Sequence, residues 1–258
     1  MSKKSKSIPS FAWENRKKDL EKTIRYHTFC VMFYRTNLWV HSNRVESIVK
    51  EFLPTVLATY PDFDGKMALL IPRFHDDHEL IIGDIPTLLK LMMNGEEHSL
   101  LEQEEIAAAE LLSRSYGNPQ IEGYQYHDLL MHAILNDCRE AQLFKLADKL
   151  DGYCEALHEV LAGNTGFLEP VINYVGKTFN DLPGNFPLIK EIFKGQQLFN
   201  FLVTDLKPYF KYGGIGAFLH TPESIKEETG IFHYELWKKI TLSMSDGMDL
   251  LTRKTESF

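Results

Sequence analysis

Apolar residues recur at helical spacing along most of this chain, and this pattern predicts an all-α protein. The clearest segment has five apolar residues that repeat every three or four positions: Val45, Ile48, Val49, Phe52 and Leu53. This spacing places them on one face of a helix over residues 42–53, which Pro54 is expected to end or kink. No stretch alternates apolar and polar residues for long enough to predict a sheet.

The same spacing predicts further helices at 11–34, 66–82, 102–112, 126–135 and 139–162, with a short helix ending at Leu91. Within 66–82, Pro72 marks a possible kink or restart. These helices define three parts of the chain. Residues 1–10 form a flexible basic arm, residues 11–164 a helical core, and residues 165–258 an aromatic-rich helical extension packed on that core.

The charge balance limits the classes of partner. The chain has 28 basic and 36 acidic residues and a formal net charge of -8. A general nucleic-acid binder needs a basic face to displace counterions from phosphates, so we expect no nucleic-acid partner. Small phosphorylated ligands remain possible, because a bound metal ion supplies local positive charge.

The chain also lacks the usual signals for membrane insertion and export. No apolar run approaches the ~18–20 residues that span a bilayer. The start, MSKKSKSIPS, is basic but is not followed by an apolar segment, so it is not a signal peptide. We therefore expect a cytoplasmic protein with no membrane partner. The apolar extension makes a homodimer plausible.

Four residues that suit a metal ion are spread over the predicted helices: His41, His75, Asp76 and Asp148. Imidazole and carboxylate groups together suit Mn²⁺, Fe, Co²⁺ or Zn²⁺. Two histidines and two aspartates would leave coordination positions for water and a substrate oxygen, as a catalytic site requires.

Further carboxylates follow the first His-Asp pair, in the segment HDDHELIIGDIPT at 75–87. Glu79 comes four residues after His75, and Asp84 lies in a loop just beyond. Carboxylates clustered beside a metal site are costly unless they bind cations or exchange protons. A second pair, His127-Asp128, is followed by LLMHAIL with no carboxylate loop, so we interpret it as incidental.

These motifs resemble those of the HD-domain phosphohydrolases. His41, His75-Asp76 and Asp148 follow the family pattern H…HD…D, and the string HD-x-x-E-x-x-x-GD-x-P-T is similar to that of the bacterial 5′-deoxynucleotidases. The segment LADKLDGYCEA resembles the final ligand helix of that subgroup. The resemblance covers residues 25–162.

The resemblance implies an all-helical HD domain that holds one divalent metal ion through His41, His75, Asp76 and Asp148. The ion could be Mn, Co, Zn, Fe or Ni. Glu79 and Asp84 are the implied catalytic residues: the first positions or deprotonates the attacking water, and the second orients water and phosphate. The implied reaction is hydrolysis of a deoxynucleoside 5′-monophosphate.

Substrate contacts are less clearly marked. Thr87 and Lys90 match the loop and the lysine that follow the motif in the subgroup. For the phosphate arginine the candidates are Arg35 or Arg25, and for a surface on which the base could stack they are Trp39 or Tyr26.

Two alternatives to the nucleotidase stay open. Triphosphohydrolases and phosphodiesterases use the same ligand set on this fold, and some relatives with two irons are oxygenases. A non-catalytic nucleotide sensor is the other possibility, favoured by Val40 at a position that is usually acidic in the subgroup and opposed by the presence of Glu79 and Asp84.

Overall fold

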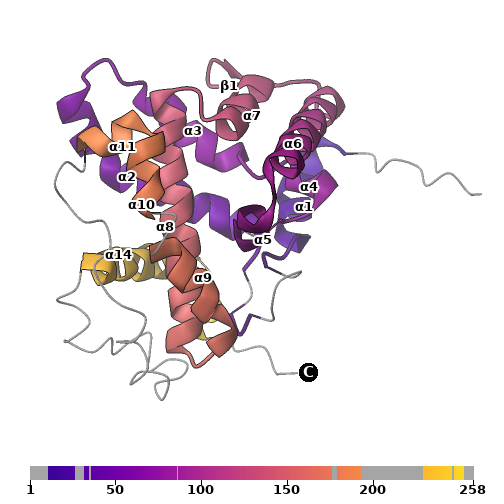
Figure 1. Ribbon diagram of the computed structural model, residues 1–258. Helices are drawn as coiled ribbons and strands as arrows, with labels where there is room; N and C mark the ends of the chain where they lie inside the picture. Colours follow the sequence, from indigo (N-terminus) through magenta and orange to yellow (C-terminus); the bar gives the residue numbers. More distant parts are fainter. Residues whose placement is uncertain are drawn as a thin grey trace, which may run out of the picture.

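The computed structural model describes residues 11–26, 32–34, 36–85, 87–175, 179–192, 229–245 and 247–252. These residues are mostly helical, which confirms the predicted all-α class (Figure 1). The protein is built around one long helix, α8 (Arg139–Leu161), against which helices from both ends of the chain pack.

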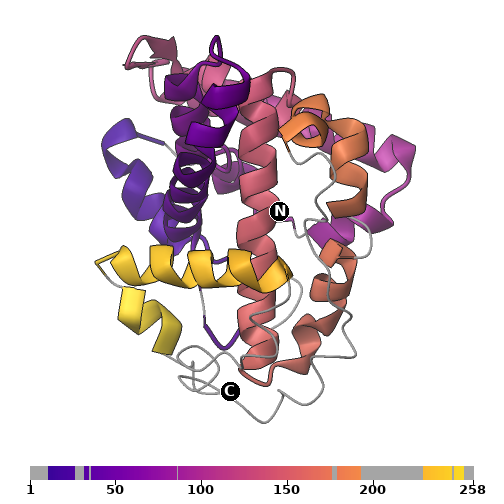
Figure 2. The same cartoon turned by 90° about the vertical axis from the view of Figure 1, so that its left-hand side faces the viewer.

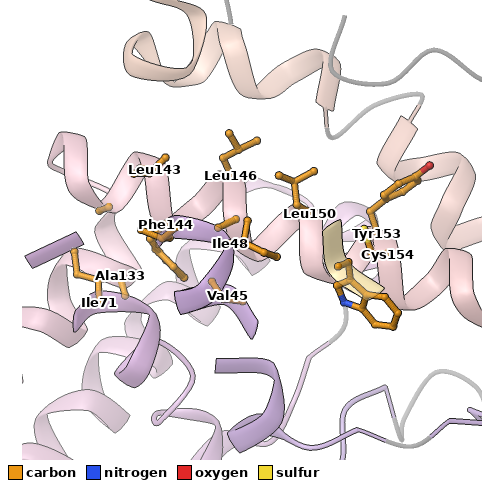
Figure 3. Close-up of a cluster of buried hydrophobic side chains, with 14 of the residues drawn as sticks. Val45, Ile48, Ile71, Ala133, Leu143, Phe144, Leu146, Leu150, Tyr153 and Cys154 are labelled. Carbon is orange, nitrogen blue, oxygen red and sulfur yellow. The ribbon is translucent and has the colours of Figure 1, made fainter. Parts of the chain in front are cut away.

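Helix α8 is buried on all sides along its second half. Every residue from Leu150 to Leu161 is buried, as expected for a helix enclosed by its neighbours. Helices α2 (Leu38–Thr59) and α3 (Gly65–Phe74) pack on α8 and on each other. Figure 3 shows the contact, where Val45 and Ile48 of α2 meet Phe144 of α8. Helices α2 and α3 therefore meet α8, which is distant from them in the sequence, in the core.

Helix α2 begins and ends outside the predicted limits of 42–53. The Asn37 side chain accepts a hydrogen bond from the Val40 N–H and caps the first turn, which adds residues before the predicted start. The helix does not end at Pro54 but continues to Thr59. Pro54 is exposed, so its ring and missing N–H disturb only the solvent side of the helix.

The predicted helix over 66–82 is divided, and the division does not fall at Pro72. Helix α3 runs through Pro72 to Phe74, a turn covers residues 75–78, and α4 (Glu79–Ile82) follows. A tertiary contact accounts for the turn, since Asp77 accepts two hydrogen bonds from the Arg16 guanidinium and one from the Tyr126 hydroxyl. The His-Asp pair therefore lies in a turn with both side chains directed inward.

The N-terminal segment is only partly helical, so the prediction of a helix over 11–34 is wrong. A 3-10 turn, η1 (Trp13–Asn15), leads into α1 (Arg16–Lys22), and the chain then becomes extended. Ile24 forms an antiparallel bridge with Asn37. This bridge uses backbone groups that a continuing helix would have used, and it brings Arg25 beside the start of α2.

The middle of the chain supplies one wall of the core. Helices α5 (Thr87–Met92), α6 (Gly95–Ser115) and α7 (Tyr126–Leu135) follow α4, and α6 is longer than predicted because Asn94 and Glu97 form a capping box. A small hairpin that the sequence did not predict joins β1 (Gln120–Ile121) to β2 (Tyr124–Gln125). Both of its turn residues have positive φ, as a two-residue hairpin of type I′ requires.

The chain beyond α8 forms η2 (Thr165–Phe167), α9 (Leu168–Asn173), α10 (Phe179–Asn185), α11 (Pro187–Ile192), α14 (Thr229–Ser243) and α15 (Gly247–Thr252). Helix α14 crosses α8 and also contacts α2 (Figure 2). Among the described residues, no helix is both long enough and apolar enough to cross a bilayer.

Candidate metal centre and active site

The four predicted ligands come together from three segments of the chain. His41 lies in α2, His75 and Asp76 in the turn after α3, and Asp148 in α8. The two Nε2 atoms of the histidines are 3.1 Å apart. His41 Nε2 lies 3.4 Å from Asp76 Oδ2 and 3.4 Å from Asp148 Oδ1, and His75 Nε2 lies 3.0 Å from Asp76 Oδ1.

The hydrogen bonds of the two imidazoles fit a cation between them. His41 Nδ1 lies 2.7 Å from Asp151 Oδ2, and His75 Nδ1 lies 2.8 Å from the Pro72 carbonyl oxygen. Both partners can only accept, so each Nδ1 carries the proton. The two Nε2 atoms then face each other across 3.1 Å, and two bare lone pairs at this distance repel unless a positive charge lies between them, either a bound cation or a second proton on His41. Burial and Arg25 lower the pKa of His41, but hydrogen bonds to Asp148 and Asp151 outweigh them and raise it to about 9, so the site attracts positive charge. The donor set and its orientation therefore fit a divalent metal ion.

The electrostatics of the two aspartates also favour a cation at this site. Burial raises the pKa of the Asp76 carboxyl, but the nearby His75, His41 and Arg25 outweigh burial and hold it below its usual value. Burial acts likewise on Asp148, where Lys149 and Lys145 hold the pKa well below the usual range. Both aspartates are anions at neutral pH, and anionic oxygens beside imidazole nitrogens attract a cation.

A second layer of buried charge holds His41 from behind. Asp151, with no exposed surface, accepts hydrogen bonds from His41 Nδ1, from Arg44 Nε at 2.7 Å and from Arg44 Nη2 at 3.1 Å. Arg44 also bonds Glu155, which accepts from the Thr36 hydroxyl. We call Arg44, Asp151 and Glu155 the inner network. It fixes the ring orientation of His41, as partners of ligating histidines do.

On the other side of the ligands lies a cavity of about 240 Å³. His75, Asp76 and Asp148 line it, and so do Glu79 and Asp84. Glu79 is buried, and its Oε2 atom has no hydrogen-bond partner. Burial and the charges of Asp76 and Asp84 raise the pKa of the Glu79 carboxyl well above its ordinary value. An acidic group with a raised pKa and a free oxygen in a cavity is suited to proton transfer.

The loop after α4 directs Asp84 into the same cavity. Gly83 has φ +83°, a conformation that strains any residue with a side chain, and the chain turns there. The Asp84 carboxylate accepts a hydrogen bond from the Tyr26 backbone N–H, so it is held against the turn formed by Arg25 and Tyr26. This contact joins the motif loop to the N-terminal segment across 58 positions of sequence.

Four basic side chains line the cavity: Arg25, Lys90, Lys145 and Lys149. Lys149 Nζ lies 3.0 Å from Asp148 Oδ2, and Lys145 Nζ lies 3.6 Å from the same oxygen. Burial and the charge of Lys149 lower the pKa of Lys145 to about 8. Arg25 Nη1 is 3.3 Å from Asp76 Oδ2. A cavity that combines anionic metal ligands with clustered cations suits a substrate phosphate.

A comparison with protein families decides what this site belongs to. Residues 18–181 match the model of the YfbR-like 5′-deoxynucleotidase family. The chain belongs to that family. It is therefore a metal-dependent phosphohydrolase, as predicted, and the reaction of the YfbR-like family is hydrolysis of nucleoside 5′-monophosphates. The matched range contains the four predicted ligands together with Glu79 and Asp84.

The fold is similar to that of a solved structure. An HD-domain phosphohydrolase from Listeria innocua has 19% identity and a TM-score of 0.55, covering 91% of this chain and all of that one. At this identity the likeness shows the fold. A conserved hypothetical protein from Pyrococcus furiosus has 23% identity and a TM-score of 0.47, covering 65% of this chain and 96% of that one. No curated protein sequence matches the chain.

Of the residues predicted to contact substrate in this YfbR-like protein, some line the cavity and others do not or lie outside the described structure. Lys90 lines the cavity, where its Nζ donates to Glu105 Oε1 at 2.7 Å. Trp39 is not among the cavity residues, and its ring instead lies 5.2 Å from Lys17 Nζ. Arg35 lies outside the described residues. Thr87 begins α5, but its side chain is outside the described part of the structure.

The structure also adds residues to the predicted site. Arg25 and Tyr26, the alternatives to Arg35 and Trp39, both line the cavity. Lys145 and Lys149 were not predicted. The signal was present, because two lysines four positions apart on either side of Asp148 share one face of a helix with it. His127-Asp128, interpreted as incidental, lies at the start of α7 with both side chains substantially exposed.

Proposed function

We propose that this protein hydrolyses a deoxynucleoside 5′-monophosphate with one divalent metal ion held by His41, His75, Asp76 and Asp148. The observation that carries the proposal is the convergence of four ligand atoms, since His75 Nε2 and an oxygen from each of two ionised aspartates lie within 3.4 Å of His41 Nε2. A divalent ion bound there would polarise a phosphoryl oxygen and lower the pKa of a coordinated water.

Glu79 is the proposed general base. In this role its free Oε2 atom accepts a proton from the water whose oxygen attacks phosphorus. The new P–O bond forms as the bond to the 5′ oxygen breaks. That oxygen takes up a proton from solvent and leaves as the nucleoside hydroxyl, and Glu79 releases the proton it accepted to solvent. The raised pKa of Glu79 supports this role, because a stronger base takes the proton more readily at neutral pH. Asp84, across the cavity, orients the water and the phosphate.

The basic side chains are proposed to hold the phosphate. Arg25 is nine-tenths buried between Asp76 and Glu155, so its guanidinium direction is fixed before a substrate arrives. Lys90, Lys145 and Lys149 lie around the same cavity, where charge-assisted hydrogen bonds to phosphate oxygens are strong. Apolar residues at the cavity, among them Ile85 and Ile134, are the proposed contacts of sugar and base.

A triphosphohydrolase is the second candidate, and one observation favours it. Four cations around one cavity exceed the number that a single phosphate requires, and they could hold a longer phosphate chain. The monophosphate is the first candidate because part of this positive charge is balanced within the chain: Lys90 is paired with Glu105, and Lys145 and Lys149 lie beside Asp148.

Substrate panels can separate the two candidates. Metal-stripped protein is supplied separately with Mn²⁺, Co²⁺, Mg²⁺ and Zn²⁺ and then with deoxynucleoside mono-, di- and triphosphates. We expect inorganic phosphate from the monophosphates with at least one metal. Release of triphosphate or pyrophosphate from triphosphates, without turnover of monophosphates, would replace the proposal with the second candidate. If no combination of metal ion and nucleotide gave turnover, both candidate functions would be contradicted.

A further inference from the structure

The inner network receives a donor from the far end of the chain. Trp237, in α14, donates its indole Nε1–H to Asp151 Oδ1 at 2.8 Å. Asp151 is the residue that accepts from His41 Nδ1, so a single carboxylate joins α14 to a proposed metal ligand. Helix α14 lies outside residues 18–181, the part of the chain that matches the family model.

Trp237 completes the hydrogen bonding of Asp151. A carboxylate has about four lone-pair positions, and Asp151 has four donors: His41 Nδ1, Arg44 Nε, Arg44 Nη2 and Trp237 Nε1. Because Asp151 has no exposed surface, water cannot replace a lost donor. Without the indole N–H, Oδ1 depends on Arg44 alone, and the carboxylate is less firmly held against His41.

The Trp237 ring also holds the cation of the same network. Arg44 Cζ lies 5.0 Å from the centre of the ring, within range of a cation–π contact. On its own helix, Trp237 stacks on Tyr234 at a centroid distance of 5.8 Å. Tyr234 bonds His158 rather than Asp151, with 2.9 Å between its hydroxyl and His158 Nδ1. The two aromatic residues therefore share one packing environment, but only Trp237 contacts the carboxylate behind His41.

We propose that Trp237 is a positioning residue for the metal site, acting through Asp151 on the orientation of His41. This inference rests on the proposed function, because it requires the four-ligand site to bind a metal ion. Outer partners of metal-ligating histidines typically contribute about 10–100-fold to metal affinity. Trp237 supplies one of four hydrogen bonds to such a partner, so we expect an effect of about tenfold, at the lower end of that range.

The test is metal affinity measured by calorimetric titration of metal-stripped protein with Mn²⁺. Trp237→Phe removes the N–H and keeps an aromatic ring over Arg44. Tyr234→Phe is the matched control, since it removes a buried hydrogen bond from the same helix without touching Asp151. We expect the Kd for Mn²⁺ to rise about tenfold in Trp237→Phe and to stay within about twofold in Tyr234→Phe.

The inference is overturned if Trp237→Phe binds Mn²⁺ like the unmodified protein, or if both variants weaken binding equally, which would indicate a general packing effect. Failure of the unmodified protein to bind Mn²⁺ would overturn the proposed metal site and this inference together. If the unmodified protein binds Mn²⁺ and the Trp237→Phe variant binds it with the same Kd, only the inference about Trp237 is overturned and the proposed metal site stands.

If Trp237→Phe fails to fold, the inference can be tested on the unmodified protein by NMR. Its three tryptophans give separate indole N–H signals in ¹⁵N-resolved NMR spectra. We expect Zn²⁺ to shift the Trp237 signal, while Trp13, which packs on Tyr116 and Tyr126, serves as the reference. A Trp237 signal that moves no more than that of Trp13 overturns the inference.

Discussion

The two ring nitrogens of His41 face two clusters of buried charge that are built differently. On the Nδ1 side, the inner network pairs Asp151 and Glu155 with Arg44 at hydrogen-bonding distance. On the Nε2 side, Asp76, Glu79, Asp84 and Asp148 gather around the cavity, and we call them the cavity cluster. Each cluster has one carboxylate oxygen without a hydrogen-bond partner, but Glu155 Oε2 lies 3.3 Å from Arg25 Nε, whereas Glu79 lines the cavity and has a raised pKa.

The difference separates charges that support the fold from charges available for chemistry. Burying a carboxylate costs free energy unless a cation or several donors compensate it. In the inner network each carboxylate is paired with an arginine, Asp151 with Arg44 and Glu155 with both Arg44 and Arg25. The cavity cluster is only partly compensated, so its remaining negative potential is available to a metal ion and a proton.

The largest expected effect is on the cavity side. Glu79→Gln keeps the shape of the side chain but cannot accept a proton from water. We expect phosphate release to fall about 10²–10⁴-fold, the usual contribution of a general base, with metal content unchanged. Single-turnover phosphate assays and elemental analysis measure the two quantities. Asp128→Asn, in the exposed second His-Asp pair, is the control and should keep full activity.

The same substitution should act in the opposite direction on stability. Because the pKa of Glu79 is higher in the folded than in the unfolded protein, its ionisation destabilises the fold as pH rises above the ordinary glutamate value. We therefore expect metal-stripped Glu79→Gln to melt at higher temperature than the unmodified protein at pH 7, and at a similar temperature near pH 4. Equal melting temperatures at both pH values would contradict the raised pKa.

The inner network should respond as a structural unit. Arg44→Met leaves Asp151 and Glu155 buried without their main cation. Breaking a buried ion pair in this way costs about 3–5 kcal/mol, so urea unfolding should show a loss of that size. Lys66→Met breaks the exposed pair with Glu122 and should cost no more than about 1 kcal/mol. Similar losses in the two variants would show that the inner network contributes no more to stability than an exposed ion pair.

A smaller effect is expected on the pH dependence of turnover. The charge of Asp84 is one of the causes that raise the pKa of Glu79. Asp84→Asn removes that charge, so Glu79 deprotonates at lower pH and reaches its active form sooner. The acidic limb of the profile of kcat/KM against pH should therefore move to lower pH, even though the maximal kcat/KM of the variant falls. A shift to higher pH would contradict this coupling.

The smallest effect is expected at Trp39, which the sequence suggested as a stacking surface. Its ring lies against Lys17 and does not line the cavity. We expect Trp39→Phe to leave the KM for a deoxynucleoside monophosphate within about twofold, the scale of a substitution that touches no substrate. A KM increase of tenfold or more would show that Trp39 contacts the substrate.

The sequence predicted what depends on local pattern. Helical periodicity gave α7 and α8 almost to the residue, and the string from His75 to Thr87 marked one wall of the cavity. Motif context also separated two identical dipeptides. His75-Asp76 is buried at the ligand cluster, whereas His127-Asp128 lies at the surface.

The sequence failed where distant contacts decide the local structure. The break after Phe74 depends on Asp77 bonding Arg16, which is 61 positions away. The end of α1 depends on the bridge between Ile24 and Asn37, and this bridge brings Arg25 to the cavity. Periodicity within a window contains no information about such pairings. The link from Trp237 to Asp151, over 86 positions, was missed for the same reason.

The most direct test of the account is the position of the metal ion. Crystals grown with Mn²⁺ and measured at its absorption edge give that position through anomalous scattering. We predict one peak per chain, within bonding distance of His41 Nε2, His75 Nε2 and a carboxylate oxygen from each of Asp76 and Asp148. A peak elsewhere, such as at the cluster of His132, Asp137 and Cys138, with none at these four residues, would contradict it.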